Sequence, residues 1–436
     1  MTPARRATIR ETAPWSARRG APRDGVAAAA ALALLVALSV GPRRARADVV
    51  IDWNEAALRT TAAAAFDPPL EARNLAILHA AIFDAVNAIT GEFQPYATTA
   101  RPVAGASPQA AAAAAAHRVL VQLYPAQKAE LDLVYARSLA ALPEGGERTA
   151  GVALGEKVAE EILARRAADG ADHARRPSSA TAAGTTAWVP TPPAFLPALD
   201  PGWGAVRPFV LERGSQFRPA PPPPPDSAEQ ARDFAEIKAI GAARSTTRTG
   251  AQTDLARLWV ATGAQNWNPL VRQVAAARHL TVSQSARVFA LVNMAGADAF
   301  IAAWDAKFTF NQWRPVTAIR AAARDGAAED ADWTPALTTP PFPDYIAGHT
   351  TYGGAAERVL ERLFGPRPGV TLRLRSATAP GVVKSYDTFA GVSQGIVDAR
   401  VWGGIHWRTS CVRGRAVGQR VGDHVADHAL RPRPLR

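Results

Sequence analysis

Five basic side chains in the last third of the chain have the types and the spacing needed to surround one tetrahedral oxyanion. Lys307 and Arg314 stand seven residues apart, Arg400 and His406 stand six apart, and His349 lies between the two pairs. Lysine offers a point charge and arginine a planar fork of donors, and both suit phosphate-like oxygens. Histidine adds a group that exchanges a proton near neutral pH. These segments therefore predict chemistry on phosphate or on a group of similar shape.

The segment from Lys307 to Pro315 follows a long apolar stretch with helical periodicity. Pro315 restricts Arg314 to an extended or turn conformation, so we expect the helix to end there. If helical geometry persists across the seven residues, about two turns, both cations fall on one side. The aromatic residues around them indicate a partly buried strip, where unpaired cations are unfavourable. Two solvated surface cations are the alternative for this segment taken alone.

Gly348 and His349 stand at the entry to a helical run over 350–364. The first amides of a helix have no acceptor within it, and its dipole favours an anion at that end. Gly348 lets the backbone approach closely, and His349 is placed to act as a general acid or base. An ordinary histidine cap is the alternative.

Arg400 lies near the end of a helical run over 385–402, and His406 follows two glycines at 403 and 404. Two glycines inside a helical pattern indicate the close approach of a ligand or of another backbone. This predicts that Arg400 grips an oxygen of the anion and that His406 reaches its central atom. A helix break with a surface histidine is the alternative.

The scaffold that positions these residues reads as all-α, with helical bundles of about a dozen helices. Apolar residues recur at helical spacing over 70–89, 108–123, 126–142, 147–166, 227–243, 253–262, 267–279 and 283–307, with Gly or Pro between several of the runs. Only 369–374 reads as a short extended piece. Residues 170–226 are rich in Pro, Ala, Ser and Thr and predict a long irregular connection. We expect a single helical domain over 48–436.

Residues 1–47 have the pattern of a signal peptide: arginines, an apolar run of about 15 residues over 26–40, and small residues at 45 and 47. A retained N-terminal anchor is the alternative, and Arg18-Arg19 leaves a twin-arginine route open. The segment carries +7 of the formal net charge of +12, so the mature chain is only modestly basic, which suits a small anion and argues against nucleic acid. No later stretch predicts a membrane span, and a single cysteine excludes an intramolecular disulfide. We expect a periplasmic or secreted protein, with homo-oligomerisation left open.

The three basic segments, in this order, resemble the signature of the type 2 phosphatidic acid phosphatase and vanadium-dependent haloperoxidase superfamily. That signature reads Lys-x6-Arg-Pro, then Ser-Gly-His, then Ser-Arg-x3-Gly-x-His-x3-Asp, and the match spans 307–410. The wording of 341–349 (PFPDYIAGH) and 403–407 (GGIHW) is most similar to the soluble bacterial haloperoxidase-like branch. The resemblance implies a helical fold of the haloperoxidase and acid phosphatase type.

The resemblance also implies a role for each matched residue. Lys307, Arg314 and Arg400 would bind the oxygens of vanadate, or of phosphate in the same site, and Gly348 would donate its backbone N–H. His406 would be the axial vanadium ligand, or the nucleophile of a phosphatase. His349 would be the catalytic acid or base. Hydrogen peroxide, a halide and an organic acceptor would be the reactants of a haloperoxidase, and a phosphomonoester that of a phosphatase.

Three departures from the signature bear on turnover. Ala347 and Ala399 stand where the family has serine, and Ser410 replaces the aspartate four residues after His406. A buried partner left without such a hydroxyl would typically cost about 1–3 kcal/mol. Without the aspartate, His406 is a weaker base unless another carboxylate substitutes, with Asp344 and Asp398 the nearest candidates in sequence.

Three functions follow: a vanadate-dependent haloperoxidase, a soluble acid phosphatase that forms a phosphohistidine, and an oxyanion-binding protein without turnover. The branch wording favours the first. Retention of both histidines argues against the third, because pure binding needs no acid or base.

Overall fold

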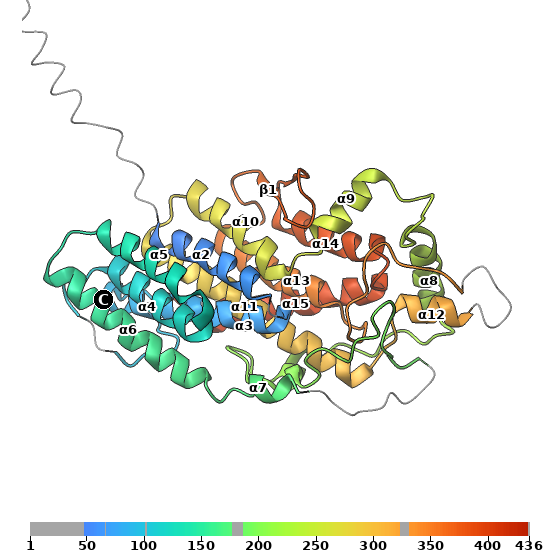
Figure 1. Ribbon diagram of the computed structural model, residues 1–436, viewed down its shortest axis with the longest axis horizontal. Coiled ribbons are helices and arrows are strands. Elements are labelled where there is room, and N and C mark those ends of the chain that lie inside the picture. Colours follow the sequence, from blue (N-terminus) through green and yellow to red (C-terminus); the bar gives the residue numbers. More distant parts are fainter. Residues whose placement is uncertain (1–47, 66, 101–102, 177–185, 323–330, 435–436) are drawn as a thin grey trace, which may run out of the picture. The chain divides into compact units, whose positions relative to one another are not determined.

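The fold is mainly helical, as predicted: the described residues form fourteen α-helices, three short 3₁₀ helices and one two-stranded sheet (Figure 1). The computed structural model describes residues 48–65, 67–100, 103–176, 186–322 and 331–434, and the predicted signal peptide lies outside them. The N-terminal helices are α2 (Val49–Ala64), α3 (Pro68–Thr90), α4 (Pro108–Leu123), α5 (Lys128–Ala140), α6 (Gly146–Arg166) and α7 (Ala171–Ala174). The later ones are α8 (Ala228–Ile240), α9 (Gly250–Leu258), α10 (Gly263–Ala277), α11 (Val282–Phe310), α12 (Pro315–Ala322), α13 (Gly348–Phe364), α14 (Phe389–Trp402) and α15 (Arg408–His428).

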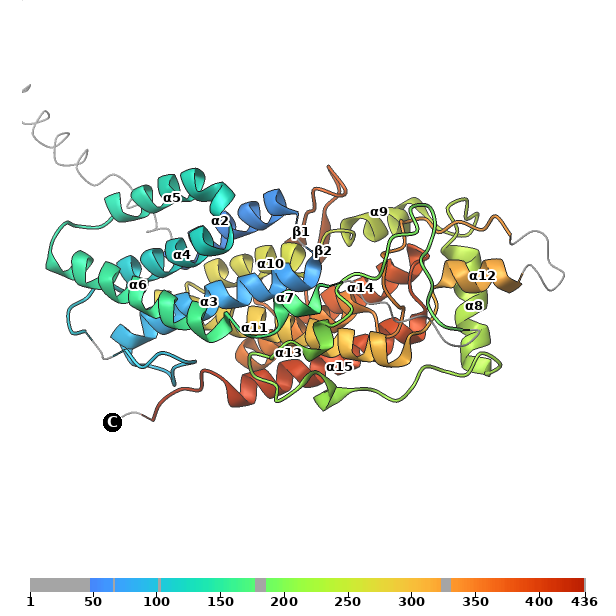
Figure 2. The same ribbon diagram turned by 60° about the horizontal axis from the view of Figure 1, so that its bottom comes forward.

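The long helix α11 forms the centre of the structure and is packed against α3, α13 and α15 (Figure 2). It begins at a capping box, in which Thr281 and Gln284 bond to each other's backbone amides, and it ends at Asn311 in the left-handed conformation. Helix α11 is long and apolar enough to cross a membrane, but 94% of its apolar 18-residue stretch is buried inside the protein. That is the environment of a core helix.

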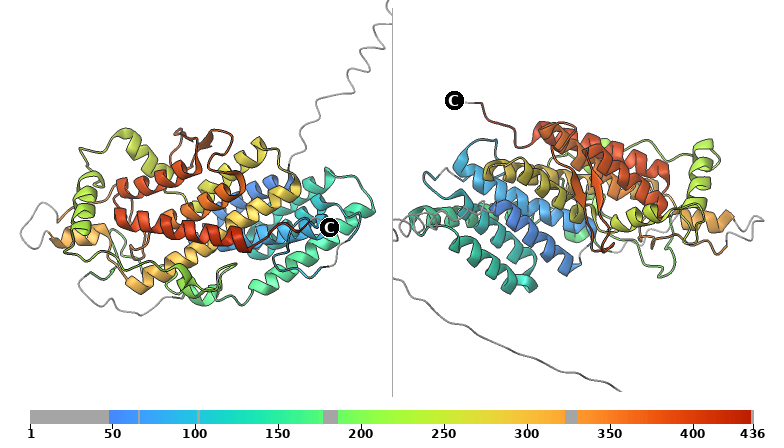
Figure 3. Two further views of the ribbon diagram at one scale, coloured as in Figure 1. Left: turned by 180° about the vertical axis from the view of Figure 1, so that it is seen from behind. Right: turned by 90° about the horizontal axis from the view of Figure 1, so that it is seen from above.

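Glycines let α15 lie close against α13 (Figure 3). This packing fixes Gly348, at the start of α13, relative to His406, which lies just before α15. A Cβ added at Gly418 would collide with the carbonyl oxygen of Thr351, and one at Gly422 would press on Ala355. Gly414 lies in the same way against the start of α13, where its Cβ would meet the Thr350 hydroxyl. Larger residues would force the helices apart.

Several predicted helix boundaries are wrong. The helix expected over 267–279 is α10, which begins at Gly263 because the Thr262 side chain caps it, and which ends at Ala277. The helix expected over 253–262 is α9, which begins at Gly250 because Thr249 and Gln252 form a capping box, and which ends at Leu258. The run expected over 385–402 starts with strand β2 (Lys384–Tyr386), which pairs with β1 (Leu372–Leu374) in an antiparallel ladder. Side-chain capping by Thr388 then starts α14.

A further correction concerns the segment between Lys307 and Arg314. Helix α11 stops at Phe310, so Arg314 is not two helical turns beyond Lys307. Residues 311–314 run without helical structure, and Pro315 begins α12, where its missing N–H is tolerated. The two cations are therefore brought together by tertiary structure and not by helical periodicity.

The connection over 170–226 contains α7 and two 3₁₀ helices, η2 (Trp203–Ala205) and η3 (Gly214–Phe217), and is otherwise irregular in its described part. Trp188, Trp203 and Phe209 are buried, whereas Phe195 is exposed. Asp298 of α11 fixes one stretch of it by accepting the backbone N–H groups of residues 209–211. The connection is thus bonded to the central helix.

Candidate oxyanion site

Lys307, in the last turn of α11, is fully buried and directed at the loop that precedes α13. Its Nζ donates to the carbonyl oxygens of Pro343 at 2.7 Å and of Asp344 at 2.8 Å. The ammonium also lies 4.8 Å from the centroid of the Phe342 ring. A lysine without solvent needs such acceptors, because an uncompensated buried charge is strongly unfavourable.

Arg314 is fully buried beside the same loop and links it to the segment that carries His406. Its Nε donates to the Phe342 carbonyl at 2.7 Å, and one terminal nitrogen (NH1) donates to the Ile405 carbonyl at 2.6 Å. Its guanidinium lies 4.7 Å from the Phe342 ring centroid. Lys307 and Arg314 therefore pack on the same aromatic side chain, although the chain between them is not helical.

His406 forms a buried cluster with Asp344 and Arg314. Its Nδ1 lies 3.2 Å from a carboxylate oxygen of Asp344, and NH1 of Arg314 lies 3.3 Å from Nδ1 and 3.1 Å from Nε2. A carboxylate only accepts, so a proton on Nδ1 suits Asp344 and leaves the lone pair of Nε2 facing the Arg314 donor. In this tautomer Nε2 is the ring nitrogen with a lone pair for an electrophilic centre.

His349 and Arg400 are held by the loop between α9 and α10. NH1 of Arg400 donates to the Trp259 carbonyl at 2.6 Å, and Nε2 of His349 lies 3.1 Å from the Ala261 carbonyl. Since a carbonyl only accepts, Nε2 of His349 carries the proton and Nδ1 is left as an acceptor. Both side chains line one cavity of about 470 Å³, together with Ile405, the neighbour of His406.

Burial sets the charge states in this cluster. It lowers the pKa of Lys307 well below its usual value, with Arg314 adding to the effect, and lowers the pKa of Arg314 and of Arg400 to about 10. Burial, and then nearby cations, lower the pKa of His349 and His406 well below 6.5, so both rings are neutral at neutral pH.

Asp344 balances only part of the positive charge. Burial raises the pKa of its carboxyl group to about 6, against the opposing effect of Arg314 and Lys307. Nδ1 of His406 and NH1 of Arg314, the latter at 3.9 Å, are its charged or titratable neighbours. Among the described residues, Asp344 is the one carboxylate within 4 Å of these buried basic side chains, and this excess of basic groups favours the uptake of an anion.

The residues fit an oxyanion because donors remain without acceptors. One terminal nitrogen of Arg314 (NH2) and Nε of Arg400 are buried and have no hydrogen-bond partner within the described residues. Gly348 begins α13, so its amide is among those with no acceptor inside the helix. A Cβ at Gly348 would crowd Phe300 and Trp304 at 3.1 Å, so glycine here also serves packing against α11. Vanadate and phosphate would both supply the acceptors that these groups lack.

The structure shows what two of the three departures from the family signature, Ala347 and Ser410, contact. The methyl group of Ala347 packs in a small apolar cluster with Val397, Val401 and Cys411. Ser410 donates to the backbone carbonyl of Asp344 at 3.2 Å, so it supports the loop. Between the two carboxylates considered as substitutes, Asp344 reaches His406.

The other carboxylate, Asp398, bonds to Arg408 at 2.9 Å instead. The paired glycines near it have a packing role. The backbone of Gly404 adopts φ +75° and lies so close to Gly241 that any side chain would collide with the Gly241 carbonyl. Close backbone approach is therefore the reason for this glycine.

The sequence analysis did not identify the loop between α9 and α10, or Glu71, which accepts hydrogen bonds from residues that follow this loop. Glu71 of α3 is buried and accepts from Thr262 at 2.6 Å and from Gln265 at 2.5 Å. Thr262 directly follows Ala261, whose carbonyl holds His349. An acidic residue inside an apolar helical run was the available signal, because a buried carboxylate requires donors.

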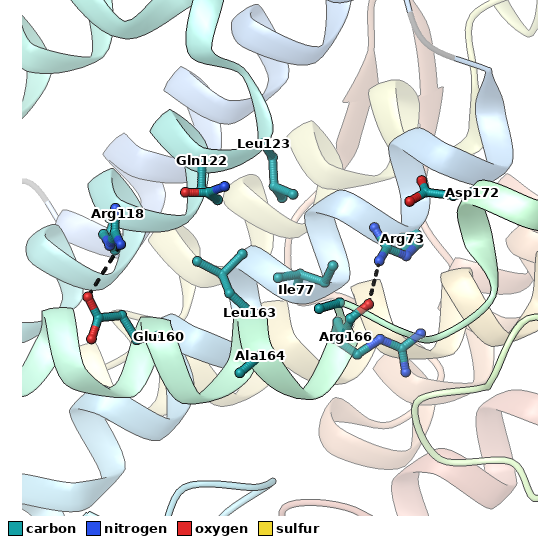
Figure 4. A pocket seen from close by; sticks show the side chains of 11 residues that line it. Arg73, Ile77, Arg118, Gln122, Leu123, Glu160, Leu163, Ala164, Arg166 and Asp172 are labelled. Carbon is teal, nitrogen blue, oxygen red and sulfur yellow. Dashed lines mark hydrogen bonds and ion pairs between the residues drawn. The ribbon is translucent and has the colours of Figure 1, made fainter.

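A second cleft, of about 480 Å³, lies between α3, α4 and α6, and Figure 4 shows its side chains. Its cations already have partners: Arg73 bonds to Asp169 at 2.7 Å, and Arg118 pairs with Glu160 at 3.3 Å. The guanidinium of Arg166 bonds to the backbone carbonyls of 207 and 208. This cleft therefore lacks the excess of positive charge found beside Asp344.

Comparisons with known proteins show which proteins resemble this chain in sequence and in fold. A family model described as the VCPO second helical-bundle domain matches residues 287–433. Vanadium chloroperoxidase from Curvularia inaequalis is 27% identical over 424 residues, which cover 75% of this chain and 67% of that protein. The crystal structure of a bacterial vanadium-dependent iodoperoxidase superposes with a TM-score of 0.78 at 24% identity, covering 90% of this chain and 98% of that one.

The apo form of a bacterial vanadium-dependent chloroperoxidase superposes with a TM-score of 0.68 at 17% identity, covering 83% of this chain and 94% of that one. The matched residues 287–433 contain Lys307, Arg314, His349, Arg400 and His406. The chain is therefore similar in sequence and in fold to vanadium-dependent haloperoxidases, in agreement with the resemblance of its three basic segments.

Proposed function

We propose that this protein is a vanadate-dependent haloperoxidase, which uses hydrogen peroxide to oxidise a halide. The observation that carries the proposal is the contact of His406 Nδ1 with Asp344, which favours a lone pair on Nε2, beside one nitrogen of Arg314 and one of Arg400 that have no acceptor within the described residues. Bound vanadate would supply the Lewis acid that activates peroxide.

In this proposal the side chains divide the work. Lys307, Arg314 and Arg400 would bind the oxygens of the anion, the Gly348 amide would add a donor, and Nε2 of His406 would hold the central atom. The Asp344 carboxylate keeps the His406 proton on Nδ1. His349 is neutral, and its Nδ1 acceptor takes a proton from the peroxide that enters the cavity.

The same donors would hold phosphate, so an acid phosphatase working through a phosphohistidine at His406 is the second candidate. The favourable observation is again the unprotonated Nε2, since a nucleophile needs its lone pair. A protein that binds an oxyanion without turnover is the third.

One experiment separates the three. The purified protein is loaded with orthovanadate, and iodide oxidation by peroxide is measured beside hydrolysis of para-nitrophenyl phosphate. We expect vanadate-dependent iodide oxidation, lost in His406→Ala together with vanadium binding, and lost in His349→Ala with binding retained. Phosphate hydrolysis alone would favour the phosphatase. Binding without either activity would favour the third candidate.

We also propose that residues 1–47 are an export leader, that the mature protein is periplasmic or secreted, and that 48–436 is a single domain. The charged and apolar pattern of the leader supports the first point. N-terminal sequencing of the exported protein should begin at or near Asp48. Retention of Met1 would contradict it.

A further inference from the structure

A third cleft, of about 450 Å³, lies between α2, α10 and the turn that follows β1, and α10 packs against both α2 and β1 (Figure 1). It shares no lining residue with the cavity beside His349. Three arginines line it, Arg59, Arg272 and Arg375, and Glu55 is the one carboxylate among its lining residues. The cleft therefore carries a net positive charge.

The carboxylate of Glu55 does not balance this charge, because it pairs with Arg59 at 3.0 Å. Neither Arg272 nor Arg375 forms an ion pair with a carboxylate in the part of the chain that the structure describes. Burial lowers the pKa of Arg272 from its usual range, Glu55 opposes this effect from a distance, and Arg59 adds to it. Two of the three guanidinium groups are thus available to an external anion, unlike the paired arginines between α3, α4 and α6.

A buried array of side chains positions Arg272. Its NH1 donates to Oδ1 of Asn54 at 2.9 Å. Asn54 is fully buried, and its Nδ2 donates to Oδ1 of Asn268 at 2.8 Å and lies 2.9 Å from Nε2 of His79. Because both of these contacts use the amide nitrogen of Asn54, its oxygen is fixed toward Arg272. The guanidinium is therefore preorganised, and its other two nitrogens make no hydrogen bond within the described residues.

We propose that this cleft binds a small dianion, a dicarboxylate or a phosphate, between Arg272 and Arg375. A guanidinium is a planar fork of donors that matches the oxygens of either group, and two unpaired guanidinium groups match two negative charges. Ala261, whose carbonyl accepts from His349, also lines the cleft, so the dianion would contact the loop that holds His349. The site does not depend on the proposed haloperoxidase function.

Four variants test this site. Arg375→Gln removes one charge from an exposed side chain, where the fold does not depend on it. Arg373→Gln is the matched control, since Arg373 is also exposed, lies two residues away and does not line the cleft. Arg272→Gln removes the positioned guanidinium, and Arg272→Lys keeps the charge without the fork. The probes are succinate, inorganic phosphate and, as a monoanion, acetate. Binding is measured by calorimetry at low ionic strength, because salt screens exposed charges.

We expect at least one of the two dianions to bind roughly tenfold more tightly than acetate. Its Kd should rise about tenfold in Arg272→Gln, which loses a charge-assisted hydrogen bond, and about three- to fivefold in Arg375→Gln, whose charge is exposed. Arg272→Lys should have a smaller effect than Arg272→Gln, and Arg373→Gln should leave the Kd unchanged.

Tighter binding of succinate would identify a dicarboxylate as the ligand, and tighter binding of phosphate would identify a phosphate. Phosphate also suits the oxyanion site, so the binding that counts is the component that Arg375→Gln weakens. Absence of binding by both dianions, or acetate binding as tight as theirs, would overturn the inference. So would equal Kd values in Arg375→Gln and Arg373→Gln, or an unchanged Kd in Arg272→Gln. If circular dichroism shows that Arg272→Gln is unfolded, Arg272→Lys takes its place in this comparison.

Discussion

We expect Arg400 to lower the stability of the anion-free protein and to strengthen anion binding. The substitution Arg400→Met tests both effects. The side chain is 3% exposed, has one backbone acceptor, and makes no ion pair with a carboxylate in the described parts of the chain. Burial lowers the pKa of Arg400 to about 10, which corresponds to roughly 3 kcal/mol of destabilisation of the charged form. Methionine has a similar length and carries no charge.

Removal of the charge should relieve that destabilisation, but the Trp259 carbonyl would lose its donor, which costs about 1–2 kcal/mol. Without an anion, we therefore expect Arg400→Met to raise the free energy of unfolding by about 1–2 kcal/mol. Orthovanadate at a hundred times its Kd should stabilise the original protein by about 2.7 kcal/mol. The variant should lose a charge-assisted hydrogen bond and bind about 10- to 100-fold more weakly.

The order of stability should thus reverse as orthovanadate is added, as followed by urea unfolding across an anion titration. Arg287→Met is the control, because Arg287 is half-buried and donates to one backbone carbonyl, that of Leu430, on the opposite end of α11. The control should change stability by the same amount with and without the anion. A destabilised Arg400→Met protein, or one that orthovanadate stabilises fully, would refute the reasoning.

Three further outcomes follow from other parts of the structure. Asp344→Asn should raise the Kd for vanadate about 10- to 100-fold while leaving phosphate binding equal or tighter, because the carboxylate orients His406 but repels the anion; calorimetry with both anions checks this. Gly418→Ala should lower the free energy of unfolding by about 1–3 kcal/mol, because its Cβ collides with the backbone of α13, whereas Gly146→Ala, with open space around it, should not. Burial raises the pKa of Asp200 to about 7, so its contribution to stability is present at pH 4 and lost as pH rises through 7. In Asp200→Asn the fall in unfolding free energy between pH 5 and 8 should shrink by up to about 2.5 kcal/mol, and an unchanged pH profile would contradict it.

Local periodicity predicted most of the helices, because their apolar stripes face one shared core. The run over 108–123 coincides with α4, and the long apolar run over 283–307 is α11 with three more residues at its C-terminal end. Boundaries failed where a cap or a strand partner intervened, as at the start of α9 and before α14. The antiparallel partner of 372–374 could not be predicted from spacing, because pairing depends on residues ten positions away.

The sequence by itself determined which residue types the chain brings to the chemistry, and in what order. Three cations, two histidines and the glycine at the start of α13 already indicate an oxyanion, since no other side chains match its charge and geometry so well. What the tertiary structure decided is how their charges and tautomers are set. Asp344 reaches His406, while Asp398 turns to Arg408, and no spacing rule distinguishes the two.

Tertiary structure also decided which residues surround the site. The loop over 259–262 holds Arg400 and His349 through backbone carbonyls, which carry no sequence signal because every residue has one. The cavity combines residues from 68 to 405, far apart in the chain, and its apolar character exists only after folding. Charge is a local property of the sequence, whereas burial, which sets pKa values and exposes unsatisfied donors, is a property of the packed structure.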